Sequence, residues 1–320
     1  MSRFVDKVVI VTGSSSGIGQ ENAIHFAEEG AKVVITGRNA EGLDRTIKIM
    51  QEKGVPADRI LSIKGSINEP GFPEELIKQT IEKWGRNAEG LDRTIKIMQE
   101  KGVPADRILS IKGSINEPGF PEELIKQTIE KWGRLDVLVN NAAVIQAPAI
   151  DINSIENYDY VFNINLRSLV LLSQLAIPHL LKTKGNVVNI SSVVALKMHK
   201  DFLYYCMTKA ALDHYTKGCA ARYAPEGLRF NCVNPGYTRT PIFTRHEDNI
   251  DAEAATDHME ATFIRQSVPT KRMATVREIS EGILFLASPV ASYCNGTCLL
   301  IDGGYASETM PCGRFDVYVN

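Results

Sequence analysis

The amino-acid sequence predicts an α/β fold, a doubly wound parallel sheet with helices on both faces. Residues 7–12, KVVIVT, form a near-continuous β-branched run, which is typical of a strand buried on both faces. A glycine-rich segment follows at once and leads into an amphipathic helix and a second apolar strand. Two later apolar runs, at residues 135–139 and 187–190, also end in polar residues. Open α/β sheets bind their ligands at this carboxyl end of the strands.

Composition and charge exclude several other classes of protein. The 320 residues are 44% hydrophobic, which is typical of a soluble globular protein with a substantial core. The net charge is only −2 and no Lys or Arg run occurs, which argues against nucleic acid or a membrane as partner. The most apolar stretch, residues 169–181, is interrupted by polar residues, and the first residues do not form a signal peptide. We therefore expect a cytoplasmic protein.

The first strand, turn and helix predict a dinucleotide site. Residues 12–19, TGSSSGIG, connect the strand to a helix that runs to about Glu29, and residues 32–36 form the second strand. Glycines in such a turn let the backbone approach a pyrophosphate, and the start of the helix offers unpaired N–H groups. The alternative is an ordinary tight turn, which the surrounding strand-helix-strand context disfavours.

Residues 37–84 recur without a substitution as residues 85–132. Functional repeats normally diverge, and a solenoid needs at least three units. The pair therefore indicates a recent tandem duplication or an artefact of the gene sequence. A Gly-Arg dipeptide begins each copy and recurs at residues 133–134, which is consistent with a misaligned join at that point.

Each copy predicts a helix, a strand, a turn and a second helix; in the first copy these are Ala40 to Lys53, Arg59 to Lys64, Asn68 to Pro73 and Pro73 to Trp84. One copy completes a βαβ segment. The surplus copy, taken as residues 85–132, either loops out or adds an edge strand. Closing a loop of that length costs about 3 to 4 kcal/mol, which a domain stable by about 5 to 15 kcal/mol tolerates with a reduced margin. The sequence leaves open which copy supplies the third strand.

A proton-transfer site is predicted within residues 189–209, NISSVVALKMHKDFLYYCMTK. Ser192 follows a buried strand, and Tyr205 and Lys209 lie four residues apart on the next helix, so their side chains share one face. A fold-back between strand and helix brings hydroxyl, phenol and ammonium together. Tyr204 is a weaker candidate, because the residue four positions later is Thr208.

Several motifs in order resemble the short-chain dehydrogenase/reductase family. They are Gly13-x-x-x-Gly17-x-Gly19, Asn140-Asn141-Ala142-Ala143, Asn165, Ser192 with Tyr205-x-x-x-Lys209, Asn234-Pro235-Gly236 with Thr240, and residues 271–288 and 296–304. Ala143 stands where the family has glycine. The resemblance covers residues 5 to 306 apart from the second repeat copy, and it implies a single Rossmann-type domain at residues 1–306, followed by a tail at residues 307–320.

The resemblance also implies a cofactor site. Its residues would be Gly13, Ser15, Ser16, Gly17, Ile18, Gly19, Arg38, Asn141, Ala142, Tyr205, Lys209, Pro235, Gly236, Thr238 and Thr240. NAD sites place a carboxylate at the end of the second strand, whereas NADP sites need a cation there. Arg38 occupies this place, so NADP(H) is favoured. Where relatives commonly carry an Asp after the third strand, this chain has Ser66 or Ser114.

The implied reaction is hydride transfer between nicotinamide and a ketone or secondary alcohol. In it Tyr205 acts as general acid and base, Ser192 donates a hydrogen bond to the carbonyl oxygen, and Asn165 holds a relay water. Lys209 and an oxidised nicotinamide would lower the pKa of Tyr205, because a free tyrosine with a pKa of about 10 is a poor base. The alternatives are an NAD-preferring relative and a non-catalytic cofactor-binding or scaffold protein disabled by the duplicated segment.

The remaining expectations concern assembly, metals and the chain's last third. The six cysteines lack metal-ligand spacing and are expected to be free thiols, and no histidine pair indicates a metal. Residues 241–269 are expected to form a helical lobe over the substrate. Tyr158 to Leu181 and Tyr205 to Tyr223 read as helices suited to packing against a second copy, so a homodimer or homotetramer is expected.

Overall fold

The computed structural model describes residues 3–5, 7–14, 17–37, 40–55, 60–64, 115–148, 150–240, 242–243 and 252–307. Within these residues a seven-stranded sheet has the strand order β3-β2-β1-β4-β5-β6-β7, and each neighbouring pair is parallel. The strands are β1 Val8–Thr12, β2 Lys32–Gly37, β3 Ile60–Lys64, β4 Val137–Asn140, β5 Asn186–Ile190, β6 Arg229–Pro235 and β7 Cys298–Ile301. The predicted doubly wound α/β fold is confirmed.

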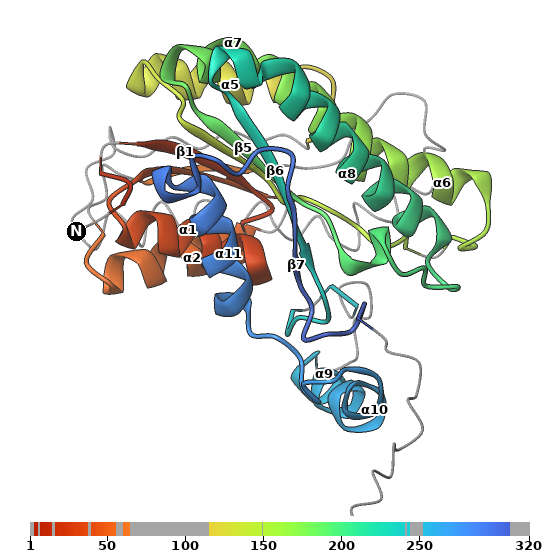
Figure 1. Ribbon diagram of the computed structural model, residues 1–320. Helices are drawn as coiled ribbons and strands as arrows, with labels where there is room; N and C mark the ends of the chain where they lie inside the picture. The colour runs from red at the N-terminus through yellow and green to blue at the C-terminus, as the bar shows by residue number, and fades with distance from the viewer. Residues whose placement is uncertain are drawn as a thin grey trace, which may run out of the picture.

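Helices cover both faces of this sheet (Figure 1). They are α1 Gly17–Glu28, α2 Ala40–Glu52, α5 Phe120–Trp132, α6 Ile155–Phe162, α7 Ser168–Thr183, α8 Leu203–Tyr223, α9 Ala252–Met259, α10 Arg265–Ser267 and α11 Val276–Ala287. One apolar core lies between the sheet and α1, α2 and α11, and a second between the sheet and α5, α7 and α8. Alternate β1 residues serve the two cores: Val9 and Val11 enter the first, and Val8 and Ile10 the second. This double burial explains the β-branched run of the first strand.

The described residues draw on both copies of the repeat. Helix α2 and strand β3 come from the first copy, and β3 pairs with β2 in parallel register from Val33 opposite Ile60 to Gly37 opposite Lys64. Helix α5, which packs against α7, comes from the second copy. The first copy therefore supplies the third strand. The second helix expected in the first copy and the first helix and strand expected in the second copy lie outside the described residues, as do Ser66 and Ser114.

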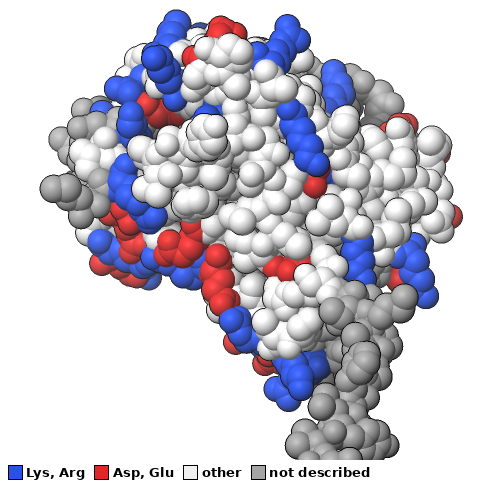
Figure 2. All heavy atoms as spheres, in the orientation of Figure 1, with Lys and Arg blue, Asp and Glu red and all other residues white. Residues whose placement is uncertain are grey.

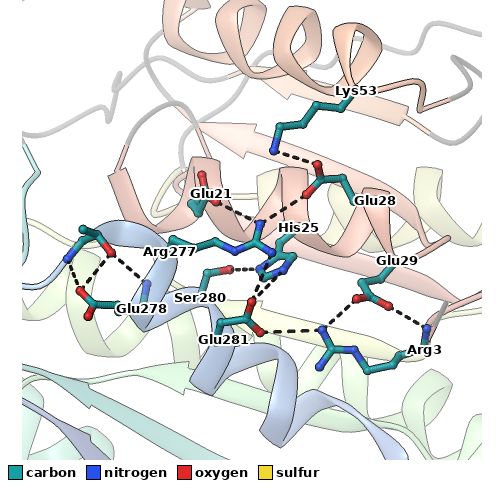
Figure 3. A network of polar contacts seen from close by, with 11 residues as sticks. Arg3, Glu21, His25, Glu28, Glu29, Lys53, Arg277, Glu278, Ser280 and Glu281 are labelled. Atoms are coloured by element: carbon teal, nitrogen blue, oxygen red, sulfur yellow. Dashed lines mark hydrogen bonds and ion pairs between the residues drawn. The ribbon is translucent and has the colours of Figure 1, made fainter. Parts of the chain in front are cut away.

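A polar network joins α1 to α11 on one side of the sheet (Figure 3). At its centre His25 is 2% exposed, and its ring contacts the Ser280 hydroxyl at 3.0 Å and the Glu281 carboxylate at 3.2 Å. Arg277 pairs with Glu21 and Glu28 at 3.5 and 3.4 Å. Charged side chains gather over this part of the surface, whereas the region around β7 is mostly uncharged in the same view (Figure 2).

Helices α6 and α7 are joined by a π-helical segment, Asn163–Arg167, into one long helix. Among the described residues, this helix, Ile155–Thr183, is long and apolar enough to cross a membrane by length and composition alone. Half of its most apolar window is buried inside the protein, as expected for a core helix. Its packing against a second copy of the chain stays a prediction from sequence.

Candidate active site

The carboxyl end of β5 carries the hydroxyl predicted from the sequence. Ser192 follows the strand, and its Oγ caps a short 3₁₀ turn, Val193–Ala195, by accepting a hydrogen bond from the Val194 N–H at 3.3 Å. Beside it, the Ser191 hydroxyl donates to the Lys209 carbonyl at 3.2 Å. The strand end is therefore tied to α8 at the turn that carries Lys209.

Tyr205 and Ser192 are brought together as predicted. Burial raises the pKa of Tyr205 to about 12, and a hydrogen bond with the Ser192 hydroxyl opposes part of this rise. The neighbouring Tyr204 points elsewhere, because its hydroxyl donates to the Asn153 carbonyl at 2.9 Å and its ring packs edge-on against Tyr158. The preference for Tyr205 over Tyr204 therefore agrees with the geometry.

Lys209 reaches the same strand end from the first turns of α8. It is 1% exposed, and its Nζ donates to the Ile190 carbonyl at 2.7 Å and lies 5.4 Å from the centre of the Tyr205 ring. Burial lowers the pKa of Lys209 to about 8, while the nearby Cys232 and Asp213 side chains oppose this shift. The ammonium thus sits beside the phenol in a site with little solvent.

Asn165 lies in the π-helical segment between α6 and α7. Its Oδ1 accepts from the Val144 N–H at 2.8 Å, and its Nδ2 donates to the Val144 carbonyl at 2.7 Å. The side chain is fully buried and holds the loop after β4 against the long helix. π-bulges often occur at functional sites. The direct role of this side chain is therefore to position the loop, and a relay water on Asn165 stays a prediction.

The glycine-rich turn closes tightly on the residues after β4. Asn141 Nδ2 donates to the Thr12 carbonyl at 2.8 Å and to the Gly13 carbonyl at 3.2 Å. A Cβ on Gly13 would lie 2.7 Å from that nitrogen, and a Cβ on Gly19 would lie 2.5 Å from it. Gly13 also has a φ of +66°, a conformation that other residues rarely adopt. Only glycine fits these positions without a shift of the backbone.

Thr240, which follows β6 in the other half of the sheet, lies against the same glycine-rich turn. A Cβ on Gly17 would lie 2.9 Å from Thr240 Cγ2, and Gly17 has a φ of +59°. Thr238 lies two residues earlier, 5% exposed, with its hydroxyl donating to the Gly236 carbonyl at 3.1 Å. The segment after β6 therefore borders the start of α1, which is the arrangement that a dinucleotide spanning both halves requires.

The structure brings most of the predicted site residues to one edge of the sheet. The catalytic candidates Ser192, Tyr205 and Lys209 lie at the end of β5 and the start of α8, and Asn165 holds the loop next to them. The cofactor candidates lie at or after the ends of β1, β4 and β6; they are Gly13, Gly17, Ile18, Gly19, Asn141, Ala142, Pro235, Gly236, Thr238 and Thr240. Ser15, Ser16 and Arg38 lie outside the described residues. Residues 242–243 and 252–269 of the expected lobe are described, and they include α9 and α10.

The hydrogen bonds among the buried polar residues behind the site were not predicted from the sequence. Asn234 Nδ2 donates to the Ser192 carbonyl at 3.2 Å and to Asp213 Oδ2 at 2.8 Å. Asn189 Nδ2 donates to the Thr216 hydroxyl at 2.8 Å, and Asn140 Nδ2 donates to Asn189 Oδ1 at 2.9 Å. The available signal was asparagine inside apolar strands, where a buried amide must find partners.

Family models for nicotinamide-dependent enzymes match nearly the whole chain. A model described as enoyl-(acyl carrier protein) reductase matches residues 86–306, and one described as short chain dehydrogenase matches residues 7–87. The two matches meet where the two repeat copies join.

Curated proteins and a solved structure are similar over almost the full length. The chain is 28% identical to 3-oxoacyl-(acyl-carrier-protein) reductase from Thermotoga maritima, over 94% of this chain and 98% of that protein. It is 28% identical to cyclopentanol dehydrogenase from Comamonas testosteroni, over 96% and 100%. A crystal structure of a short-chain dehydrogenase/reductase of unknown function from Caenorhabditis elegans, with cofactor, is 30% identical with a TM-score of 0.75, over 96% of this chain and 97% of that one.

Proposed function

The chain belongs to the short-chain dehydrogenase/reductase family of oxidoreductases, and we propose that it transfers a hydride between NADP(H) and a ketone or secondary alcohol. The observation that carries this proposal is the meeting of Ser192, Tyr205 and Lys209 at the end of β5. The family uses a nicotinamide cofactor. Its pyrophosphate is proposed to lie at the glycine turn, where Gly13 and Gly17 have positive φ and the start of α1 offers unpaired N–H groups.

Each residue has a separate task in this reaction. The nicotinamide, when bound, supplies or accepts the hydride. In reduction, the phenol of Tyr205 gives its proton to the carbonyl oxygen, and the Ser192 hydroxyl donates a hydrogen bond to the same oxygen. Lys209 places an ammonium beside the phenol and, in the resemblance, on the ribose hydroxyls. Asn165 keeps the loop after β4 in place and is proposed to hold the water that returns a proton to Tyr205.

The cofactor-free site holds Tyr205 in its acid form. Because burial raises the pKa of Tyr205 to about 12, its phenol is protonated at neutral pH and ready to act as an acid. General acid catalysis of this kind contributes about 10² to 10⁴ in rate. Oxidation needs the phenolate, and the positive charge of the oxidised nicotinamide is the proposed source of its stabilisation.

The preference for NADP(H) rests on the residue after β2. Strand β2 ends at Gly37, and residue 38, which follows it, is an arginine rather than an acid. A guanidinium at this place can pair with a 2′-phosphate in two-point geometry. A carboxylate there would instead bind the ribose hydroxyls of NAD. The proposal therefore predicts that Arg38→Leu removes the preference for NADPH over NADH.

Apolar side chains support a ketone or secondary alcohol as substrate. Leu196 and Met198 follow Ser192 and are 62% and 63% exposed, and the Phe243 ring lies 6.3 Å from that of Phe202. Exposed apolar side chains beside a catalytic pair form a surface that binds carbon chains or rings. The cyclopentanol dehydrogenase relative acts, by its name, on a secondary alcohol.

The test is NADPH oxidation by the full-length chain over a panel of ketones, compared with Tyr205→Phe and the matched control Tyr204→Phe. We expect Tyr205→Phe to lower kcat/KM by about 10² to 10⁴ because it removes the proton donor, and to change the Kd for NADPH far less. Tyr204→Phe should keep the activity, since its hydroxyl contacts Asn153 instead.

Three results would count against the proposal or a part of it. Full activity in Tyr205→Phe would exclude the tyrosine as proton donor. NADPH binding without turnover of any ketone or alcohol would favour the non-catalytic alternative. A higher kcat/KM with NADH than with NADPH would remove the argument from Arg38 and leave an NAD-preferring enzyme.

A further inference from the structure

Behind the proposed active site, three side chains with no task in the proposed reaction bring a carboxylate and two thiols together. Asp213 of α8, Cys232 of β6 and Cys298 of β7 place one oxygen and two sulfur atoms within 4.8 Å of one another. Asp213 and Cys232 are buried, and Cys298 is partly exposed on β7, the edge strand of the described sheet. We call these three residues the Asp-Cys-Cys cluster.

Strand register and helix period create this cluster. Cys232 lies directly opposite Cys298 in the parallel pairing of β6 with β7, so both side chains leave the same face of the sheet. The Cys232 thiol donates to the Thr216 hydroxyl at 3.0 Å, which shows that this face is the one covered by α8. Asp213 lies one turn before Thr216 on the same helix face. Cys232 and Cys298 are also hydrogen-bonded to each other.

The two oxygens of the Asp213 carboxylate differ in their hydrogen bonding. Its Oδ2 accepts from Asn234 Nδ2 at 2.8 Å, which fixes the orientation of the group. Its Oδ1 is buried and makes no hydrogen bond of standard geometry with the described residues, and the Cys298 thiol is a donor that interacts with the same carboxylate. A buried acceptor without a partner is uncommon and calls for an unseen ligand, such as a water or an ion.

The donor types and spacing fit a particular class of ion. Thiolates and a carboxylate together suit zinc, which takes sulfur at about 2.3 Å and oxygen at about 2.0 to 2.2 Å. Tetrahedral geometry at those lengths sets the donor atoms about 3.5 to 3.8 Å apart. Donors already within 4.8 Å need to close by only about 1 Å.

The surroundings of the Asp-Cys-Cys cluster also compensate its negative charge and leave a route by which an ion can enter. The ammonium of Lys209 interacts with Asp213 and Cys232, and that of Lys217 interacts with Cys298. These positive groups offset part of the charge that two thiolates and a carboxylate bring. Because Cys298 is partly exposed, an ion can enter at the sheet edge and keep a water as its fourth ligand.

We propose that Asp213, Cys232 and Cys298 bind one divalent, thiolate-preferring metal ion of the zinc class. Each thiol that binds the ion releases its proton to solvent. The ion would join α8 to β6 and β7, directly behind Lys209 and, through Asn234, behind Ser192. Its role would be structural, because none of the three ligands reaches the strand end where the reaction is proposed to occur.

The experiment titrates the reduced, chelator-treated full-length chain with Co²⁺, whose thiolate complexes show a charge-transfer band in the near ultraviolet. We expect one equivalent of Co²⁺ to bind and to be displaced by Zn²⁺. Cys298→Ser should weaken binding by more than the roughly 10- to 100-fold cost of losing a group that only orients a ligand. Asp213→Asn should weaken it as well. Cys294→Ser is the matched control, since this partly buried thiol lies outside the cluster.

Further readouts separate binding from folding. The Cys298→Ser chain should keep its circular dichroism spectrum and its affinity for NADPH, because the replaced thiol lies at the edge of the sheet. Zn²⁺ should raise the Tm of the unmodified chain and leave that of Cys298→Ser unchanged. The proposal would be overturned if the reduced chain gave no charge-transfer band, if Cys298→Ser bound Co²⁺ as tightly as the unmodified chain, or if mass spectrometry found Cys232 and Cys298 joined in a disulfide that persists in reductant.

Discussion

At the residue scale, the proposed reaction gives Tyr205 two tasks that need opposite protonation states. As the acid in carbonyl reduction it must carry its proton, and burial secures this by raising its pKa to about 12. As the base in alcohol oxidation it must lose that proton near neutral pH. In the chain alone Lys209 is not among the groups that shift this pKa, although its Nζ lies 5.4 Å from the centre of the Tyr205 ring. For the oxidation, the bound cofactor therefore has to supply the positive charge that stabilises the phenolate of Tyr205.

We predict that Tyr205 does not ionise below about pH 11 in the cofactor-free chain. Addition of the oxidised cofactor should move its ionisation toward neutral pH, because a positive charge nearby stabilises the phenolate. The measurement is the ultraviolet difference spectrum of tyrosinate during a pH titration, with Tyr205→Phe subtracted to isolate one residue. A Tyr205-specific signal near neutral pH without cofactor would show that the protein itself activates the phenol.

The side chains of the proposed site could be located from the sequence, whereas the contacts that hold them could not. Ser192, Tyr205 and Lys209 stand in a pattern whose spacing alone places the tyrosine and lysine on one helix face. Asn234 belongs to one of the sequence motifs, but its hydrogen-bond partners were not predictable, because they depend on how β6 lies against β5 and α8. Contacts between elements distant in sequence follow from register, which local patterns do not encode.

At the scale of elements, the contact between α1 and α11 depends on a buried neutral histidine. The Nε2–H of His25 donates to the Glu281 carboxylate, which leaves Nδ1 to accept from the Ser280 hydroxyl (Figure 3). Burial, followed by the nearby charge of Arg277, lowers the pKa of His25 below its usual value of 6.5. Protonation would add a second N–H where Ser280 now donates, so the folded state binds this proton more weakly than the unfolded chain does.

The free energy of unfolding should therefore fall as the pH drops below 6.5, the ordinary pKa of His25, toward its lower value in the folded state. One such group contributes a slope of up to about 1.4 kcal/mol per pH unit. Urea unfolding between pH 5 and pH 8 measures it, with His25→Gln expected to flatten the curve and the exposed His214→Gln to leave it unchanged. An unchanged slope in His25→Gln would assign the acid sensitivity to other groups.

Helix positions were predicted within a few residues, but one irregularity was not. The interval from Asn163 to Arg167 is π-helical, and an apolar period of 3.6 residues carries no sign of such a segment. The π-helical segment brings the Asn165 side chain to the backbone of Val144. The two hydrogen bonds formed there compensate for the irregular helical turn. Sequence spacing thus located Asn165 without giving its contact.

At the scale of the whole molecule, the two copies of the repeat supply different elements of the fold. The described sheet takes α2 and β3 from the first copy and α5 from the second, so the extra length enters between residues 64 and 115. The two copies have identical sequences and therefore identical secondary-structure propensities, so the sequence does not predict which copy supplies β3. Removal of residues 37–84, 65–112 or 85–132 gives one and the same 272-residue chain, since 320 − 48 = 272.

We predict that this 272-residue chain is more stable than the full chain by up to about 3 to 4 kcal/mol, the entropic cost of closing 48 additional residues between two fixed ends. A gain of that size would raise Tm by about 2 to 4 °C per kcal/mol. Urea unfolding and calorimetry of both proteins measure the difference. The matched control replaces residues 65–112 by a glycine-serine linker of equal length, which keeps the length and removes the sequence. If loop closure alone is responsible, the linker chain unfolds like the full chain; a full chain as stable as the 272-residue one would mean that the additional residues gain contacts worth the entropy they cost.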